Sequence, residues 1–130
     1  MASENGAVRR VGGHAVVTMP DEIDAMNADE ILGVLLSAVR PGVADLIIDM
    51  SGTTFCDSAG VHAVIAAQKQ AAATGIRLRL VATAVLRIFT LIGADQLIPI
   101  YPTLEAALAD EPAAPPDPPD QDAAPGQTRS

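Results

Sequence analysis

A predicted helix start at Asp57 and Ser58 places a hydroxyl where it could accept a phosphoryl group. It follows a predicted buried strand over residues 46–48 and opens a predicted helix over residues 58–74. Asp57 is a suitable N-cap residue, so Ser58 would lie exposed in the first turn beside unpaired backbone N–H groups. A phosphate there would meet these donors and the helix dipole, whereas the Asp57 carboxylate would repel it. Such a new negative charge on an acidic surface suits the disruption of a protein interface.

Ser58 also allows two other interpretations. The pair Asp57 and Ser58 could be an ordinary helix start, which composition alone would favour. Ser58 and His62 are four residues apart and would share a helix face, so they could also act as a nucleophile and its base. However, the G-x-S-x-G elbow is absent and the other histidine, His14, falls in a predicted hairpin. A small serine hydrolase or nucleotide-processing enzyme is therefore the less favoured alternative.

Three other features could take part in the chemistry at this helix start. Gly60 and Cys56 lie within two residues of Ser58, and an acidic loop lies nearer the N-terminus of the chain. Gly60 costs about 0.5–1 kcal/mol relative to Ala inside a helix, so close approach of another group or tight packing must favour it. Cys56, between Phe55 and Asp57, is interpreted as a packed structural cysteine rather than a reactive thiol. The loop over residues 20–24 holds three carboxylates. Without further ligands they predict a solvated, partner-binding edge rather than a metal site.

The apolar pattern along the chain predicts an α/β fold. Gly12-Gly13 separates two short apolar runs and closes an antiparallel hairpin. Asn27 and Glu30 form a capping box for the first helix. Strands and helices then alternate, which implies right-handed crossovers and a mostly parallel sheet. The predicted order is ββαβαβαβα, with strands over 8–11, 14–17, 46–48, 76–80 and 98–100 and about four helices that begin at Asn27, Ser58, Thr83 and Thr103.

The predicted sheet also indicates where a partner would bind. Sites in parallel sheets lie at the carboxyl ends of the strands, which here lead into the loops over residues 20–26 and 51–57. The strand over residues 76–80 is predicted to be half exposed, because Arg77 and Arg79 alternate with apolar residues. The two loops over residues 20–26 and 51–57 are therefore the segments where we expect a partner to bind.

Composition narrows the class of protein further. The 130 residues carry a net charge of -8 and one cysteine, which fits a single domain without disulfides or a multi-cysteine zinc site. The basic residues are scattered, which argues against nucleic-acid binding. No signal peptide is visible, and no apolar run approaches the roughly 20 residues of a membrane-spanning helix. We expect a cytoplasmic protein with a protein partner, without membrane contact and without a cofactor.

Proline and acidic residues are concentrated near the end of the chain. The density of prolines from Glu111 onward is incompatible with helices or strand ladders, and little apolar surface is present to bury. The sequence therefore predicts a flexible N-terminus over residues 1–7, one domain over residues 8–110 and a disordered tail over residues 111–130.

Three segments of the chain resemble the STAS-domain family of anti-sigma-factor antagonists. Residues 46–61, LIIDMSGTTFCDSAGV, are similar to the family's strand, loop and D-S-[SA]-G motif. Residues 22–24 resemble its acidic loop before the first helix, and residues 84–93 resemble its third helix. The three segments occur in register with the predicted order of strands and helices. The resemblance covers about residues 8–109.

The resemblance implies a phosphorylation switch that controls bacterial transcription. In family members that work this way, the unphosphorylated antagonist binds an anti-sigma factor that is itself a serine kinase. By this resemblance Ser58 is the phosphorylation site. Ala59 stands where a serine is common and His62 where a small residue is frequent, so packing beside Ser58 would differ from the usual pattern. The predicted partner-binding residues are Asp24, Asp57, Ala59, Gly60 and His62.

The sequence therefore predicts a regulatory binding protein rather than an enzyme. The unphosphorylated form would bind the anti-sigma kinase and free the sigma factor, and phosphorylation of Ser58 would end that binding. A STAS module that binds its partners without phosphorylation, as a scaffold or sensor, is the alternative.

Overall fold

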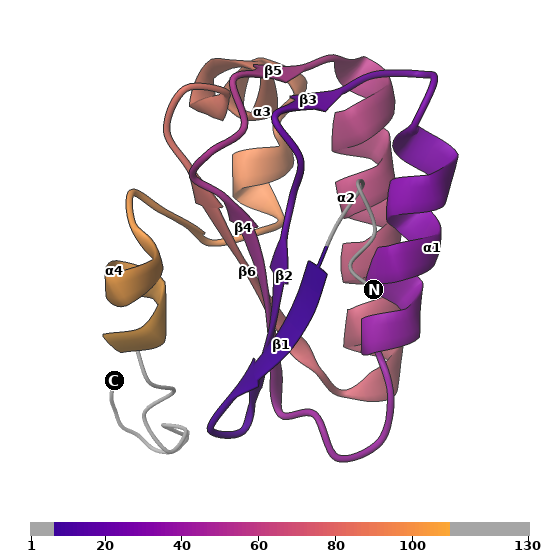
Figure 1. Ribbon diagram of the computed structural model, residues 1–130, viewed down its shortest axis with the longest axis vertical. Coiled ribbons are helices and arrows are strands. Elements are labelled where there is room, and N and C mark those ends of the chain that lie inside the picture. The colour runs from indigo at the N-terminus through magenta and orange to yellow at the C-terminus, as the bar shows by residue number, and fades with distance from the viewer. Residues whose placement is uncertain (1–6, 110–130) are drawn as a thin grey trace, which may run out of the picture.

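The computed structural model describes residues 7–109 of the protein (Figure 1). The predicted tail over residues 111–130 and nearly all of the predicted flexible N-terminus lie outside the described residues. In chain order the elements are β1 (Ala7–Val11), β2 (His14–Thr18), β3 (Glu22–Ile23), α1 (Ala28–Ala38), β4 (Asp45–Met50), β5 (Phe55–Cys56), α2 (Ser58–Thr74), β6 (Arg77–Ala82), α3 (Leu86–Ile92), the 3-10 helix η1 (Ala94–Gln96), β7 (Ile100–Tyr101) and α4 (Leu104–Ala109).

The main sheet has five strands in the order β1-β2-β4-β6-β7. β1 and β2 form an antiparallel hairpin, and the remaining neighbours are parallel. Gly12 has a φ of 62° in the hairpin turn, a conformation that glycine adopts without a steric cost. The predicted α/β class, the hairpin and the mostly parallel sheet are therefore confirmed.

The sheet separates two apolar layers of unequal size. α1 and α2 cover one face and α4 covers the other (Figure 1). Successive residues of β2 and β4 point to opposite faces, because side chains alternate along a strand. Val17 and Ile48 belong to the larger layer, whereas Val16 and Ile47 belong to the smaller layer beneath α4. β4 is therefore buried on both sides.

The prediction that the strand over residues 76–80 is half exposed is wrong. Only Arg77 of β6 is exposed, and Arg79 retains 4% of its accessible surface. The reason is α4, which lies over this face: Arg79 Nη1 donates a hydrogen bond of 2.8 Å to the Ala107 carbonyl. Arg79 Nη2 also lies 3.7 Å from Oδ1 of the buried Asp45.

Asp45 is the centre of a polar cluster at the amino ends of three strands. Its Oδ1 lies 3.2 Å from Arg77 Nε, and its Oδ2 lies 3.1 Å from His14 Nδ1. These contacts and the one to Arg79 bring one carboxylate against side chains from β2 and β6. The cluster lies at the opposite end of the strands from the predicted switch.

Two predicted helix starts differ from the structure. The Asn27 side chain makes no capping hydrogen bond to α1. Instead its Oδ1 accepts from the Asp24 amide at 3.0 Å, and its Nδ2 donates to the Glu22 carbonyl at 2.9 Å. Thr83 does not cap α3, which begins at Leu86; the Leu86 amide donates to the Thr83 carbonyl and closes a turn before the helix.

Two predictions near the end of the domain hold with small shifts. The Thr103 hydroxyl oxygen accepts a hydrogen bond of 3.0 Å from the Ala106 amide, so Thr103 caps α4 as predicted. The last strand is Ile100–Tyr101 rather than residues 98–100, and Ile98 is buried just before it. Within residues 7–109 no helix is long and apolar enough to cross a membrane.

The Asp45 cluster leads to a prediction about stability. Asp45→Asn should lower the free energy of unfolding by about 3–5 kcal/mol, because it leaves the buried Arg79 guanidinium without a carboxylate. Arg77→Ala is the matched control: its side chain is 54% exposed, so its contact with Asp45 should contribute no more than about 1 kcal/mol. Urea unfolding followed by circular dichroism measures both. Equal losses in the two variants would contradict the assignment.

Candidate functional site

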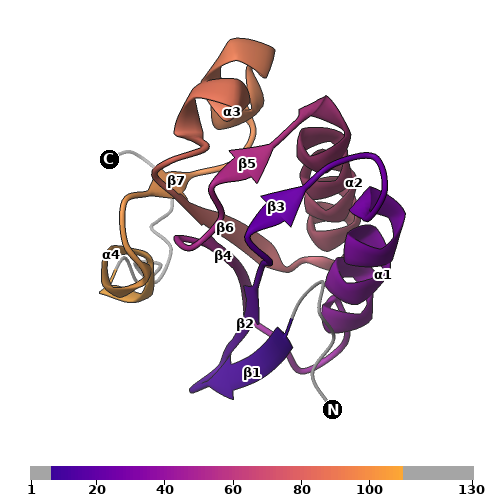
Figure 2. The ribbon, with the colours of Figure 1, turned by 45° about the horizontal axis from the view of Figure 1, so that its top comes forward.

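A second, two-stranded sheet joins the acidic loop to the segment before Ser58. β3 and β5 pair in parallel, with Glu22 opposite Phe55 and Ile23 opposite Cys56 (Figure 2). The Asp57 amide donates to the Ile23 carbonyl at 3.1 Å, which extends the pairing to the helix cap. Sequence reasoning placed both segments in loops, because strands of two residues show no periodicity. The two loops expected to meet the partner are therefore held against each other.

Asp57 caps α2 as predicted. Its Oδ1 accepts hydrogen bonds from the Ala59 amide at 3.0 Å and the Gly60 amide at 3.3 Å. Ser58 is the first residue of α2 and is exposed. Because the Asp57 carboxylate already occupies two of the first amides, a phosphate on Ser58 would compete with it for these donors. The free donors expected from the sequence are thus partly used, and the repulsion between phosphate and Asp57 becomes the stronger consideration.

The structure explains the glycine at position 60. A Cβ atom there would lie 2.6 Å from both Cys56 Sγ and Ile23 Cγ2, well inside van der Waals contact. Gly60 is buried beneath these side chains. The close approach that the sequence left open therefore comes from β3 and β5, which pack directly on the first turn of α2. The burial of Gly60 shows that this residue helps to position Ser58. A direct contact between Gly60 and a partner stays a prediction.

Cys56 is a packed cysteine. Its side chain is buried and its Sγ donates to the Asp57 carbonyl at 3.5 Å. Burial, with a smaller contribution from the negative charge of Asp57, raises the pKa of Cys56 to about 11. The thiolate is therefore disfavoured near neutral pH, which agrees with a structural rather than a reactive residue.

Asp24 orders the connection between β3 and α1. Its Oδ1 accepts from the Met26 amide at 2.9 Å, and its carbonyl accepts from the amides of Asn27 and Ala28. The turn leaves Met26 with 92% of its surface accessible, and Phe55 across the small sheet is 50% exposed. Sequence reasoning did not select Met26 or Phe55, because nothing in the pattern distinguishes exposed from buried apolar residues in short turns.

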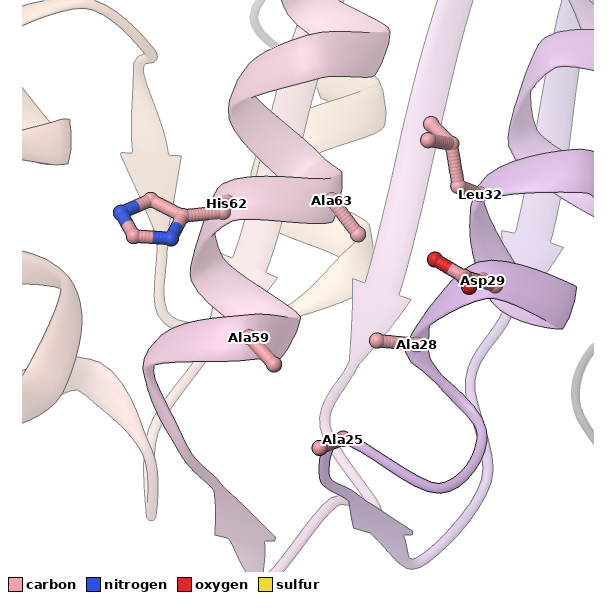
Figure 3. Close-up of a pocket in the computed structure, with 7 residues that line it drawn as sticks. All are labelled: Ala25, Ala28, Asp29, Leu32, Ala59, His62 and Ala63. Atoms are coloured by element: carbon pink, nitrogen blue, oxygen red, sulfur yellow. The ribbon is translucent and has the colours of Figure 1, made fainter.

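A shallow groove of about 360 Å³ lies between α1 and α2 (Figure 3). Figure 3 shows Ala28 and Leu32 of α1 facing Ala63 of α2 across it, while the His62 ring extends to the side of α2 away from α1. The groove is lined by Ala25, Ala28, Asp29, Leu32, Ala59, His62 and Ala63. Ala59 and His62, two of the predicted partner-binding residues, therefore border one surface feature.

Two alternative chemistries gain no support from this geometry. Within residues 7–109, Ser58 and His62 share no hydrogen bond, so no nucleophile–base pair is formed. The same residues contain no group of three or more His, Cys, Asp or Glu side chains that could hold a metal ion. The site is a surface formed by an exposed hydroxyl, carboxylates and small residues.

The sequence profile of the STAS domain matches residues 6–107, so the chain belongs to the STAS domain family. A search of curated proteins finds no match. Among solved structures, an anti-sigma factor antagonist from Mycobacterium paratuberculosis is 27% identical, with a TM-score of 0.71 over 84% of this chain and 97% of that chain. The predicted family is confirmed.

More distant structures share the fold. A STAS-domain anti-sigma-factor antagonist from Planctomyces limnophilus is 17% identical, with a TM-score of 0.73 over 83% of this chain and 98% of that chain. The murine solute carrier 26 anion transporter A9 is 18% identical, with a TM-score of 0.67 over 83% of this chain but only 22% of the transporter. The fold therefore occurs both in separate antagonists and as a domain of a transporter.

Gly60 provides a test of the packing that positions Ser58. Gly60→Ala should lower the free energy of unfolding by about 1–3 kcal/mol, because the added methyl group overlaps Cys56 and Ile23. Gly33→Ala, in the middle of α1 with no atom within 4 Å of the added Cβ, should instead raise it by about 0.5–1 kcal/mol. Thermal and urea unfolding compare the two; a stabilising Gly60→Ala would rule out the close contact.

The pKa of Cys56 predicts slow alkylation of the folded protein. With a pKa of about 11, roughly one thiol in a thousand is ionised at pH 8. Iodoacetamide should therefore react with the native protein more than about 100-fold more slowly than with the protein in urea. The native rate should rise as the pH approaches 11. A native rate at pH 8 equal to that in urea, measured by mass spectrometry, would show an exposed thiolate instead.

Proposed function

We propose that this protein is an anti-sigma-factor antagonist of bacterial transcription, switched off by phosphorylation of Ser58. The unphosphorylated protein binds an anti-sigma factor that is a serine kinase and so frees the sigma factor. It acts in the cytoplasm as a domain over residues 8–110, without cofactor, nucleic acid or membrane. The antagonist from Mycobacterium paratuberculosis, similar over almost its whole length, supports this class of partner.

One observation carries the proposal. Ser58 is exposed at the first position of α2, and the main chain on both sides of it is fixed: Asp57 is tied to β3, and Gly60 is packed under Ile23. A kinase that phosphorylates a serine needs an accessible hydroxyl in a defined position. The rigid surroundings supply the position, and the location at a helix start supplies the access.

The same geometry explains why a phosphate would weaken binding. Phosphoserine carries a charge of about -1.5 to -2 at pH 7. It would lie beside the Asp57 carboxylate, which caps α2. Asp24 is at the same end of the small sheet, because the preceding Ile23 pairs with Cys56 and its carbonyl accepts from the Asp57 amide. A complex that covers Ser58 would have to desolvate this additional charge next to a carboxylate, which costs free energy unless a cation pairs with it.

In addition to the surface around Ser58, the groove between α1 and α2 is a proposed contact region for the partner. Ala59 and His62 border it next to Ser58, and Asp29 contributes a carboxylate from α1. With Asp24 and Asp57 these residues form a mixed apolar and acidic surface. Such a surface fits a partner that presents apolar side chains and a cation.

Substitutions at Ser58 distinguish a phosphorylation switch from binding that does not depend on phosphorylation. Ser58→Ala should bind the anti-sigma factor of the same organism in the presence of ATP, whereas the wild-type complex should dissociate as phosphate is transferred. Ser58→Asp should bind at least about tenfold more weakly, since it adds a charge beside Asp57. Gln70→Glu is the matched control, because it adds one negative charge to an exposed position near the other end of α2, away from both loops. Calorimetry and the mass of the protein after incubation with ATP measure both effects.

The outcomes distinguish the two candidate modes of action. Tight binding by the wild type with no gain of mass, and equal binding by Ser58→Ala and Ser58→Asp, would favour a scaffold or sensor that works without phosphorylation. If Gln70→Glu weakened binding as much as Ser58→Asp does, the effect would be one of overall charge, which would contradict a switch at Ser58.

A further inference from the structure

The fold brings together three of the eight basic residues at a second cavity. This cavity of about 240 Å³ lies between β1 and the end of α1, far from Ser58, which begins α2 at the other end of the helix pair (Figure 1). Arg9, Arg10 and Arg40 are among the lining residues, and no acidic residue is. The expectation that the basic residues are scattered therefore fails at this one place.

The main chain of β1 places Arg9 and Arg10 on opposite faces of the sheet. Arg10 pairs with Ala15 of β2, whose side chain belongs to the apolar layer under α1. Because side chains alternate along a strand, Arg10 lies on the face of α1 and Arg9 on the opposite face. Arg10 Nη2 donates to the Gly42 carbonyl at 3.4 Å, which brings the guanidinium to the loop after α1.

Arg40 begins a tight turn in the same loop. The Val43 amide donates to the Arg40 carbonyl at 3.2 Å, and Gly42 has a φ of 95°. Proline at the second position and a glycine with positive φ at the third are typical of a type II turn, which fixes the main chain of Arg40. Arg40 and Gly42, whose carbonyl accepts the hydrogen bond from Arg10, therefore belong to one tight turn at the edge of the cavity.

The positive charge of this cavity is not neutralised by the described part of the chain. Within residues 7–109, Arg9, Arg10 and Arg40 form no ion pair, whereas Arg77 and Arg79 both contact Asp45. A guanidinium carries five N–H donors, and the hydrogen bond to Gly42 uses one of those on Arg10. The remaining donors are suited to a planar, two-point contact with a phosphate.

We propose that this cavity binds a small phosphomonoester. Arg10 and Arg40 contact the phosphate, and Arg9 adds to the positive potential from the other face of β1. The apolar side chains of Val8, Ala15 and Val43 contact a small apolar group attached to the phosphate. The volume lies below the roughly 300–1,000 Å³ of common ligand sites, which favours a compact molecule.

Phenyl phosphate is a suitable probe, because it combines a dianion with a small apolar ring. Titration of the full chain, followed by amide chemical shifts, should give saturable changes at residues 8–10 and 37–43. Inorganic phosphate should bind at the same residues more weakly, since it lacks the apolar group. The double variant Arg10→Gln/Arg40→Gln should lose at least about tenfold in affinity for phenyl phosphate.

Two controls test the location of the site. Arg87→Gln removes an exposed arginine from α3 and should leave the affinity unchanged. Ser58→Ala should also bind phenyl phosphate as the wild type does, so this proposal can hold or fail independently of the switch. Circular dichroism of each variant checks that the fold is retained.

Three results of these titrations would overturn the proposal. They are shifts that do not saturate, equal affinity of the double variant and the wild type, and an affinity that falls as much in Arg87→Gln as in the double variant. Sedimentation with vesicles of phosphatidic acid distinguishes a lipid headgroup from a soluble ligand. Binding to such vesicles without binding to phenyl phosphate would also contradict a phosphomonoester site.

Discussion

The contact of Ile23 and Cys56 with Gly60 determines where the proposed phosphorylation site, Ser58, lies. Only a residue without a side chain allows β3 and β5 to pack on the first turn of α2. The pairing of these two short strands brings the acidic loop after β2 next to the end of the loop after β4. Without that contact the carboxyl ends of β2 and β4 would lead into two independent loops. Ser58 would then begin a helix with no fixed neighbour, and a partner could not recognise both loops at once.

The larger elements could be predicted from sequence because each depends on a strong local signal. α2 has an acidic N-cap and a glycine at its C-terminus, and Gly75 adopts the left-handed conformation expected there. The small sheet could not be predicted, since its two strands are only two residues long and lie more than thirty residues apart in sequence. The burial of Arg79 escaped prediction for a related reason: alternation identifies a strand, but not the helix that later covers its second face.

The charged residues are divided between the two ends of the strands. At the amino ends, Asp45 forms ion pairs with Arg77 and Arg79, and Arg79 also donates a hydrogen bond to the Ala107 carbonyl of α4, so these charges stabilise the sheet and the attachment of α4. At the carboxyl ends, Asp24 and Asp57 accept hydrogen bonds from main-chain amides. Carboxylates used in this way order the backbone while keeping a negative potential at the surface. The acidic character of the surface around Ser58 thus follows from the carboxylates that order its loops.

Because the same carboxylates order the backbone and supply the negative charge, few substitutions can change one property without the other. Asp57→Ala would remove the charge that repels a phosphate on Ser58, and with it the acceptor of the first amides of α2. The position of Ser58 and the electrostatic effect of its proposed phosphorylation therefore both depend on one carboxylate. A phosphate on Ser58 that accepts from the same amides would displace the Asp57 carboxylate from the cap. The proposed phosphorylation would therefore rearrange the start of α2 as well as add charge at the surface, and both changes oppose a complex that recognises the unphosphorylated arrangement.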